Sequence, residues 1–363
     1  MTIKSLKLNR IHIPLSQPFV TAIRTATAVE AVRVILCDKD GVTGYGEAPA
    51  SALVTGETSA SIEEAIRVYI KPSIIGQPLD SDIGHLIQTS LHGNTSAKAA
   101  VEMAWQDLRA QKLKTPLYKL LGGHKNILAN DITISIGALD RMTQNALNAI
   151  ADGFSILKIK AGSNPETDAE QIKRLWNNIK MQTNQQALPI AFRIDANQGW
   201  DPRQAIRIIQ VWEAEGVPID LIEQPVPAWD IEGLAMVQSH TGLLIAADES
   251  VFSPRDVLRC IQQRAVSVIN IKLMKTGGIG SALDICALCR TYGLECMIGC
   301  MMESEISAAA AAHLAAAQSV VTRVDIDSPL LCSHGYYKGG PEFCGPAITL
   351  SDSPGIGTRP IAV

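Results

Sequence analysis

Three carboxylate side chains stand at the ends of three apolar stretches of the sequence. Asp195, Glu223 and Asp248 each end such a run, and about 25 to 28 residues separate one from the next. If the runs are neighbouring parallel strands, their C-terminal ends meet at one edge and bring the three acids together. Hard cations such as Mg²⁺ prefer oxygen ligands of this kind. We therefore predict one Mg²⁺ per active site, held by these residues; the alternative is three unrelated exposed acids in turns.

Lysine side chains end two further apolar stretches. Residues 156–160 end in Lys158 and Lys160, which alternation places on one face of a strand, and Lys272 ends residues 266–272. As strands two and six of an eight-stranded ring, the two stretches would face each other across its mouth. Burial and neighbouring cations can lower a lysine pKa from roughly 10.4 toward about 7 to 8. Two such lysines could remove and return a proton beside a carboxylate, as in a racemase or epimerase; salt bridging is the alternative.

From residue 126 onward, short apolar strands alternate with helical stretches. The candidate strands are residues 132–136, 156–160, 190–195, 221–223, 244–248, 266–272, 294–300 and 320–327. Segments such as 168–180 and 280–292 have helical spacing between them. This alternation predicts an α/β fold with a barrel over residues 126–330. A doubly wound open sheet fits less well, because polar residues end nearly every strand, as they do when all strand tips line one pocket.

The segment before the barrel has a different pattern. Residues 4–14, 31–37 and 42–47 are predicted strands of a small antiparallel sheet, and helical spacing follows over residues 61–69 and 96–111. We therefore expect an α+β capping domain over residues 1–125. Its loops, over residues 18–27 and 49–58, have the composition of a lid or of ordinary surface loops. Residues 331–363 are rich in glycine and proline, and we expect them to return to the capping domain.

A glycine-rich stretch follows Lys272. Gly277, Gly278 and Gly280 lie between a predicted strand and a predicted helix, as the glycines of a phosphate-binding loop do. The stretch lacks the third glycine of the dinucleotide-binding pattern and the Lys-Ser/Thr pair of a P-loop. We therefore interpret it as a tight turn between strand and helix.

Composition limits the classes of partner. The chain of 363 residues has a formal net charge of −4 and a pI of about 6.0, which argues against a nucleic-acid partner. No apolar run approaches the roughly 18 residues of a membrane span, and no signal peptide is evident at the start. Eight scattered cysteines favour reduced thiols. We expect a cytoplasmic protein with a small-molecule substrate and no membrane partner. The sequence leaves open whether the protein forms a homo-oligomer.

The sequence resembles the enolase superfamily, its muconate-lactonising subgroup and, within that, the dipeptide epimerases. The resemblance covers the full length and depends on five motifs, which are residues 158–160, 195–197, 223–225, 248–250 and 272–278. It implies a modified TIM barrel, (β/α)₇β, with an α+β capping domain, so that the eighth helix should be missing. It also implies that Lys160 and Lys272 are acid/base lysines, that Mg²⁺ binds Asp195, Glu223 and Asp248, and that Lys158 contacts the substrate carboxylate.

The same resemblance implies substrate contacts. The pair Asp325 and Asp327 is similar to the motif that receives the α-ammonium group of a dipeptide, and Arg24 matches a lid arginine that pairs with a glutamate side chain. The remaining expected contacts are Thr133, Cys300, Met301 and Met302. These matches imply a dipeptide epimerase that inverts the C-terminal residue of its substrate, with the L-Ala-D/L-Glu pair as the expected substrates.

Other functions share most of these residues. Within the superfamily, the alternatives are an N-acylamino-acid racemase, an o-succinylbenzoate synthase and a muconate cycloisomerase. Their substrates lack a free ammonium group that would occupy the side of Asp325 and Asp327. A metal-binding scaffold without catalysis is the non-enzyme alternative, and the presence of both lysines and all three acids argues against it.

Overall fold

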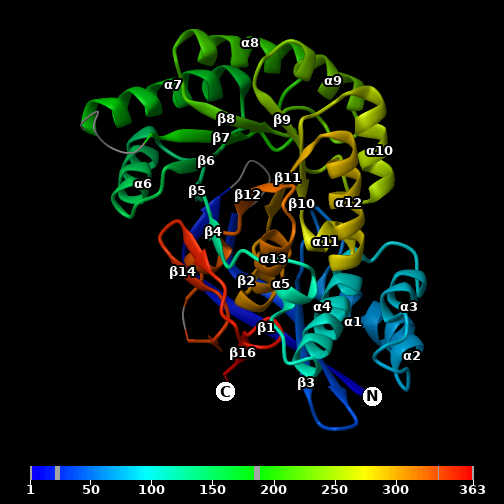
Figure 1. The fold of residues 1–363 in the computed structure, drawn as a ribbon. Coiled ribbons are helices and arrows are strands. Elements are labelled where there is room, and N and C mark those ends of the chain that lie inside the picture. The colour runs from blue at the N-terminus through cyan, green and yellow to red at the C-terminus, as the bar shows by residue number, and fades with distance from the viewer. Residues whose placement is uncertain (1, 21–24, 184–188, 334, 362–363) are drawn as a thin grey trace.

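The computed structural model describes residues 2–20, 25–183, 189–333 and 335–361, in two parts that pack against each other (Figure 1). Eight parallel strands form one sheet, in the order β5 to β12. The strands are β5 Ile132–Ile134, β6 Ile156–Lys160, β7 Ala191–Asp195, β8 Ile219–Glu223, β9 Leu244–Ala247, β10 Val268–Ile271, β11 Glu295–Gly299 and β12 Val321–Asp325. Every strand predicted for the barrel is therefore present, which confirms the expected fold.

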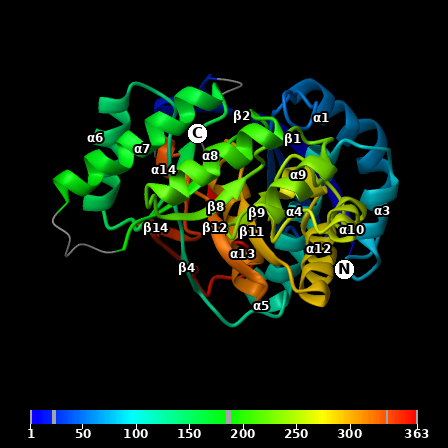
Figure 2. The ribbon, with the colours of Figure 1, turned by 90° about the horizontal axis from the view of Figure 1, so that it is seen from above.

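Helices follow the strands and surround the barrel (Figures 1 and 2). They are α6 Leu139–Ala151, α7 Pro165–Gln182, α8 Pro202–Ala214, α9 Ile231–Ser239, α10 Pro254–Gln263, α11 Leu273–Thr276, α12 Ile279–Tyr292 and α13 Glu305–Ala317. Among the described residues after β12, the only helix is the single turn α14, Ser328–Leu331, so this part of the chain lacks a full eighth helix, as expected. The seam between β5 and β12 is joined through Asn130, whose side chain donates to Ile326 O at 3.1 Å and accepts from Ile326 N at 2.8 Å.

The barrel strands are buried on both faces. Side chains that point into the barrel form one apolar cluster, which comprises Leu221, Ala246, Val268 and Met297. Their chain neighbours belong to the larger core outside the barrel, and these are Ile222, Ile245, Ile269 and Ile298. Burial on both faces explains why the strands read as nearly continuous apolar runs. The candidate site lies at the C-terminal ends of these strands, whereas Arg193, Asp220 and Arg323 form ion pairs from within β7, β8 and β12.

The N-terminal part contains a three-stranded antiparallel sheet of β1 Ile3–Val20, β2 Thr25–Asp38 and β3 Thr43–Pro49. Its first two strands are longer than we expected, because their pairing continues to Val20 opposite Thr25. Most of the loop expected over residues 18–27 is therefore strand. A register shift between Pro14 and Phe19 interrupts the regular alternation, which explains why the local sequence pattern ends early.

Several helical segments follow this sheet along the chain. They are α1 Ser59–Ala65, the π-helical η1 Ile66–Ile70, α2 Lys71–Ile74, α3 Ile83–Thr89, α4 Thr95–Lys112 and α5 Leu117–Leu120. Helix α4 lies directly on β3 because Gly44 and Gly46 have no side chains in the way. A Cβ atom would stand 2.1 Å from Ala104 O at Gly44 and 2.0 Å from Ala100 O at Gly46. This close approach fixes the position of α4, which also contacts the barrel.

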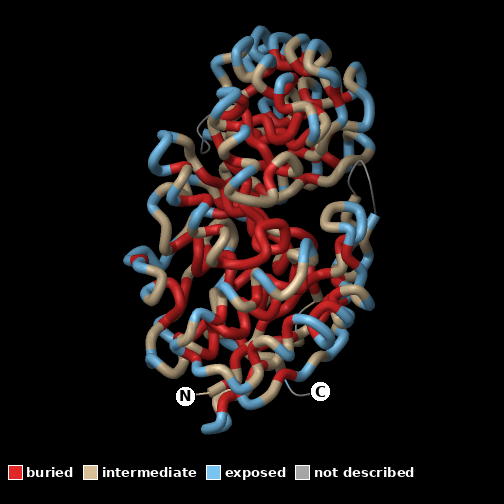
Figure 3. Tube along the Cα trace, turned by 90° about the vertical axis from the view of Figure 1, so that its right-hand side faces the viewer, coloured by how far each residue is buried: buried red, intermediate tan, exposed pale blue. Residues whose placement is uncertain are grey.

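The C-terminal segment contacts both parts of the molecule. Its short strands are β13 Tyr337–Lys338, β14 Glu342–Cys344, β15 Ala347–Thr349 and β16 Arg359–Pro360, and β15 pairs with β4, Ile127–Ala129, just before the barrel. Arg359 forms an ion pair with Asp107 of α4 at 3.1 Å. Buried segments run through both parts of the molecule (Figure 3). Within the described residues, no helix is both long and apolar enough to cross a membrane.

A buried histidine predicts a pH dependence of stability. His313 of α13 accepts a hydrogen bond from Tyr118 N at Nδ1 (3.0 Å), its Nε2 lies 3.2 Å from Ile356 O, and burial lowers its pKa to about 4. The unfolded chain binds this proton near pH 6.5. Above about pH 6.5, His313 is neutral in both the folded and the unfolded chain and does not oppose folding. Below that pH the unfolded chain is protonated first, so the free energy of unfolding should fall by about 3 kcal/mol as the pH drops to about 4.

Urea unfolding of wild type and His313→Gln at pH 7 and pH 5 tests this expectation. The variant should lose part of the pH dependence, whereas His92→Gln, at an exposed position, should keep all of it. Identical pH profiles for wild type and His313→Gln would contradict the assignment of the neutral form.

Candidate active site

The C-terminal ends of the barrel strands bring the predicted site residues together. Lys160 at the end of β6 is in register with Asp195 at the end of β7, and Asp195 is in register with Glu223 at the end of β8. Asp248 directly follows β9, and Lys272 directly follows β10. Parallel strands with crossover helices place all these ends on one side of the barrel.

The three acids lie deep in this mouth. Asp195, Glu223 and Asp248 are at most 2% exposed. Asn270 Nδ2 donates to Glu223 Oε1 at 2.6 Å, and Lys158 Nζ lies 2.7 Å from Glu223 Oε2 and 3.3 Å from Asp195 Oδ2. Burial and the neighbouring Asp195 raise the pKa of Glu223 to about 7. A nearby cation would favour the charged form of this carboxyl group and lower its pKa.

Lysines flank the acids from opposite sides of the barrel. Lys160 Nζ lies 2.6 Å from Asp195 Oδ2, and Lys272 Nζ lies 2.6 Å from Asp248 Oδ2. Their strands, β6 and β10, are separated by three strands in the barrel. Burial lowers the pKa of Lys272, but the Asp248 and Glu223 carboxylates raise it more, so it lies above its ordinary value. The protein charges alone therefore do not produce the lowered pKa that we expected for a base.

Two polar residues of the site were not assigned a role from the sequence. Lys275 in α11 is completely buried, and its Nζ lies 2.6 Å from Asp248 Oδ1 and donates to Asn270 O at 3.0 Å. Asn270 precedes Lys272 by two residues, so strand alternation could have placed it on the same face. No comparable signal identified Lys275, because its contacts depend on the turn that α11 makes.

The predicted substrate contacts lie on the other side of the mouth. Asp327 Oδ2 accepts from Thr133 N at 2.8 Å, and Asp325 Oδ2 accepts from Lys158 Nζ at 2.5 Å. Both carboxyl groups therefore already have partners within the protein. Arg24, the predicted lid arginine, lies outside the described residues.

A small cavity of about 70 Å³ joins these groups. Its lining includes every predicted substrate contact that the structure describes, which are Thr133, Lys158, Cys300, Met301, Met302, Asp325 and Asp327. Lys160, Asp248 and Lys272 also line it, while Phe19 and Val54 reach it from the N-terminal part. Two segments far apart in the sequence therefore complete the mouth.

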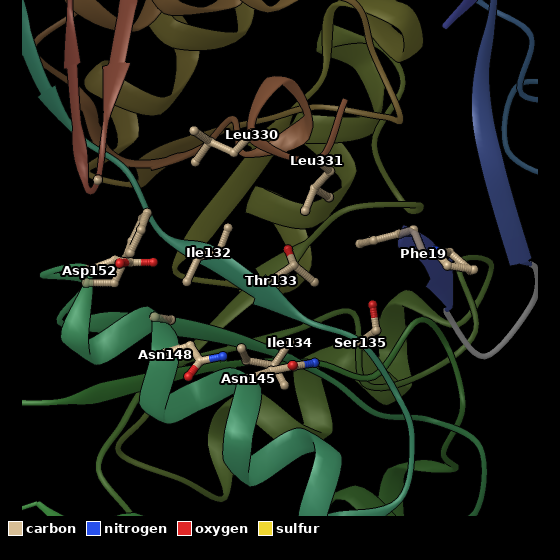
Figure 4. A pocket seen from close by; sticks show the side chains of 14 residues that line it. Phe19, Ile132, Thr133, Ile134, Ser135, Asn145, Asn148, Asp152, Leu330 and Leu331 are labelled. Atoms are coloured by element: carbon tan, nitrogen blue, oxygen red, sulfur yellow. The ribbon is translucent and has the colours of Figure 1, made fainter. Parts of the chain in front are cut away.

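A larger cavity of about 460 Å³ adjoins the mouth and shares Phe19 and Thr133 with it (Figure 4). Leu330 and Leu331 of α14 form one wall, and β5 and α6 form others, including Asn148. The cavity therefore lies beside β5 and α6, next to the single turn that follows β12.

The oxygen atoms at the mouth are of the type that binds hard cations. Glu249 Oε2, Asn197 Oδ1 and Asn270 Oδ1 are buried without a hydrogen-bond partner, and the lysine contacts of Glu223 Oε2 and Asp248 Oδ1 lack hydrogen-bond geometry. Among the described residues, no three His, Cys, Asp or Glu side chains already converge as a metal site. Lysine ammonium groups lie against all three predicted ligands instead. These carboxylate oxygens already contact positively charged groups, and carboxylate oxygens are the ligands that Mg²⁺ binds.

Comparison with known proteins identifies similar chains over both parts. The sequence model of the mandelate racemase / muconate lactonizing enzyme N-terminal domain matches residues 5–122, and the enolase C-terminal domain-like model matches residues 141–361. A Clostridium acetobutylicum protein named L-Ala-D/L-Glu epimerase is 46% identical over 363 residues, which is 99% of each chain.

Two solved structures have nearly the same fold. A substrate-liganded complex of the L-Ala-D/L-Glu epimerase from Bacillus subtilis matches with a TM-score of 0.96 and 40% identity, covering 100% of both chains. A dipeptide epimerase from Enterococcus faecalis V583, complexed with Mg and the dipeptide L-Leu-L-Tyr, matches with a TM-score of 0.93 and 38% identity, covering 99% of this chain and 100% of that one.

Proposed function

This chain belongs to the mandelate racemase / muconate lactonizing enzyme family, and we propose that it is a Mg²⁺-dependent dipeptide epimerase. The observation that carries the proposal is the position of Lys160 and Lys272 at the ends of opposing strands, with Asp195, Glu223 and Asp248 between them. Similarity to epimerases over the full length of the chain supports the same reaction.

The two lysines act on opposite faces of the α-carbon. One neutral lysine Nζ takes the α-proton, and the electron pair of the broken C–H bond passes into the adjacent carboxylate. The other lysine, as an ammonium group, gives a proton to the opposite face, which inverts the carbon and leaves the two lysines with exchanged protonation states. One Mg²⁺ per site, held by Asp195, Glu223 and Asp248, would supply the positive charge that stabilises the developing anion and favours a neutral lysine.

The opposite side of the mouth favours a dipeptide. Asp325 and Asp327 offer negative charge to the α-ammonium group of the first residue, while Lys158 stands between them and the acids, where it can contact the substrate carboxylate. Cys300, Met301 and Met302 line the cavity beside this path. N-acylated amino acids, succinylbenzoate precursors and muconates have no free α-ammonium group for Asp325 and Asp327, so the epimerase proposal uses more of the site.

We further propose the L-Ala-D/L-Glu pair as substrates and the cytoplasm as the location. The relatives of that name support the substrate, and Arg24 supplies a guanidinium suited to a glutamate carboxylate. All eight cysteines are free, as expected in a reducing compartment.

The substrate assignment predicts a selective effect of Arg24→Ala. Loss of a charge-assisted pair costs about 1.5 to 3 kcal/mol, so kcat/KM for L-Ala-L-Glu should fall roughly 10- to 100-fold. L-Ala-L-Leu, which has an uncharged second residue, should change less than about threefold. Proton NMR in D₂O, which follows loss of the α-proton of each dipeptide with Mg²⁺ present, gives both rates.

Arg10→Ala is the matched control, because Arg10 is an exposed arginine of β1 that pairs with Glu63 at 3.1 Å. It should leave both substrates unaffected. Equal losses for L-Ala-L-Glu and L-Ala-L-Leu in Arg24→Ala would reject the glutamate assignment. Exchange of N-acylamino acids alone, with no dipeptide exchanged, would reject the dipeptide class.

A further inference from the structure

A buried carboxyl group of the N-terminal part lies against the turn that follows Lys272. Glu102 of α4 is 2% exposed, and its Oε1 accepts a hydrogen bond from Gly280 N at 2.8 Å. The two residues are 178 positions apart in the sequence. Helix α4 therefore contacts the barrel through a polar group at the segment that carries a proposed catalytic lysine.

The backbone of this turn is shaped around Glu102. Lys272 is the residue before α11, and α11 is a single turn that ends at Gly277 and Gly278, with φ angles of +81° and +127°. A Cβ atom on Gly278 would lie 1.7 Å from Glu102 Oε2. The glycine pair thus allows both the unusual backbone and the close approach of the carboxyl group, which explains the glycine-rich turn seen in the sequence.

A second helix of the N-terminal part holds the same turn. Gln88 of α3 donates from Nε2 to Gly277 O at 2.7 Å. Toward the mouth, α11 is held by Lys275, which contacts Asp248 and Asn270 O. The short segment from Lys272 to Gly280 is therefore fixed at one end by the site and at the other by two helices of the N-terminal part.

The partners of Glu102 indicate a role for this particular contact. Burial raises the pKa of Glu102 to about 7, and the groups that stabilise its charged form are the backbone N–H groups of Gly280 and Ile279 and the side chain of Gln106. A carboxyl group in such an environment is costly unless its hydrogen bonds are made. Oε1 has such a bond from Gly280 N in the turn after Lys272, whereas Oε2 is buried against that turn without a hydrogen-bond partner.

We propose that Glu102, assisted by Gln88, is a positioning residue for Lys272, through which the N-terminal part sets the geometry of one of the two lysines. The proposal rests on the proposed function in taking Lys272 as a base. Lys160 is held differently, at the end of β6 beside Asp195. Disturbing Glu102 should therefore impair proton transfer on the face of Lys272 and spare the face of Lys160.

One-lysine backgrounds separate the two faces. In Lys160→Ala, exchange of the substrate α-proton with solvent depends on Lys272, and in Lys272→Ala it depends on Lys160. We expect Glu102→Leu to lower exchange at least tenfold in the Lys160→Ala background and less than twofold in the Lys272→Ala background. Glu102→Gln, which keeps an oxygen for Gly280 N, should restore most of the lost rate. Equal losses in both backgrounds, or no loss in either, would overturn the proposal.

A matched pair of glutamines provides a milder test. Gln88→Ala removes the amide contact to Gly277 O, and we expect a three- to fivefold loss confined to the Lys272-dependent exchange. Gln111→Ala removes a similar contact to Thr43 O, also 2.7 Å long, that stays within the N-terminal part. It should leave both exchange rates unchanged. A loss of the same size in Gln111→Ala would mean that the helices act only through general stability.

Amide hydrogen exchange measured by mass spectrometry tests the positioning without any turnover. Glu102→Leu in the otherwise native protein should speed exchange of the amides of residues 273–280 at least fivefold and leave residues 156–162 unchanged. An enzyme that exchanged no dipeptide would refute the proposed function and still give this measurement. Unchanged protection of residues 273–280 would refute the positioning role by itself.

Discussion

Lys160→Ala and Lys272→Ala should each lower the rate of epimerisation about 10³-fold, because general acid–base catalysis contributes about 10² to 10⁴ and inversion needs both groups. Each variant should still exchange the α-proton of one epimer with solvent, since one lysine stays beside one face of the carbon. The two variants should favour opposite epimers. Proton NMR in D₂O, started separately from L-Ala-L-Glu and L-Ala-D-Glu, measures exchange and inversion in the same sample.

Lys119→Ala is a suitable control, because Lys119 forms an exposed ion pair with Asp352 and neither residue lines the cavity at the mouth. It should epimerise at the wild-type rate. We expect the two variants to exchange different epimers because β6 and β10 lie on opposite sides of the barrel. If both lysine variants exchanged the same epimer, or if one variant epimerised normally, the two-base reaction would be wrong.

Removal of divalent cations should abolish activity, and Mg²⁺ should restore it. The three acids are buried close together, and without a cation the negative charge that develops on the substrate would meet carboxylates rather than a stabilising charge. Glu223→Gln should weaken Mg²⁺ binding at least tenfold, as measured by isothermal titration calorimetry. Full turnover after chelation would contradict the proposed metal site.

Glu223 has fewer lysine partners than Asp248. Asp248 pairs with both Lys272 and Lys275, so Asp248→Asn would remove a counter-charge from two buried lysines as well as a metal ligand. In the part of the chain that the structure describes, the Glu223 side chain is held by Asn270 and Lys158. Glu295→Gln, at the opposite end of β11 from the mouth, is the control and should bind Mg²⁺ normally.

The energies of buried ion pairs favour a role in catalysis over a role in stability for these residues. Replacing a buried ion pair by apolar groups is often neutral for stability, whereas removing one member leaves a buried charge that costs about 3 to 5 kcal/mol. Lysines and acids packed this closely are therefore a poor way to stabilise a barrel. Their concentration at the strand ends is explained by chemistry that needs paired charges.

The sequence by itself determined the barrel and the candidate residues at its mouth. Strands buried on both faces leave nearly continuous apolar runs, and the first polar residue after each run marks its end. Parallel strands joined by helices place successive ends on the same side, so the order Lys160, Asp195, Glu223, Asp248 and Lys272 along the chain predicted their order around the mouth. Local patterns suffice here because the geometry repeats from one strand to the next.

Only the tertiary structure decided which charged groups touch. The pairing of Lys158 with Glu223 and Asp325 joins residues far apart in the chain, and the raised pKa of Lys272 follows from carboxylates on other strands. The contact between Glu102 and Gly280 depends on how α4 packs on its own sheet and on the barrel at once. No local pattern contains such information, because the energy of a buried charge depends on every group that surrounds it in space.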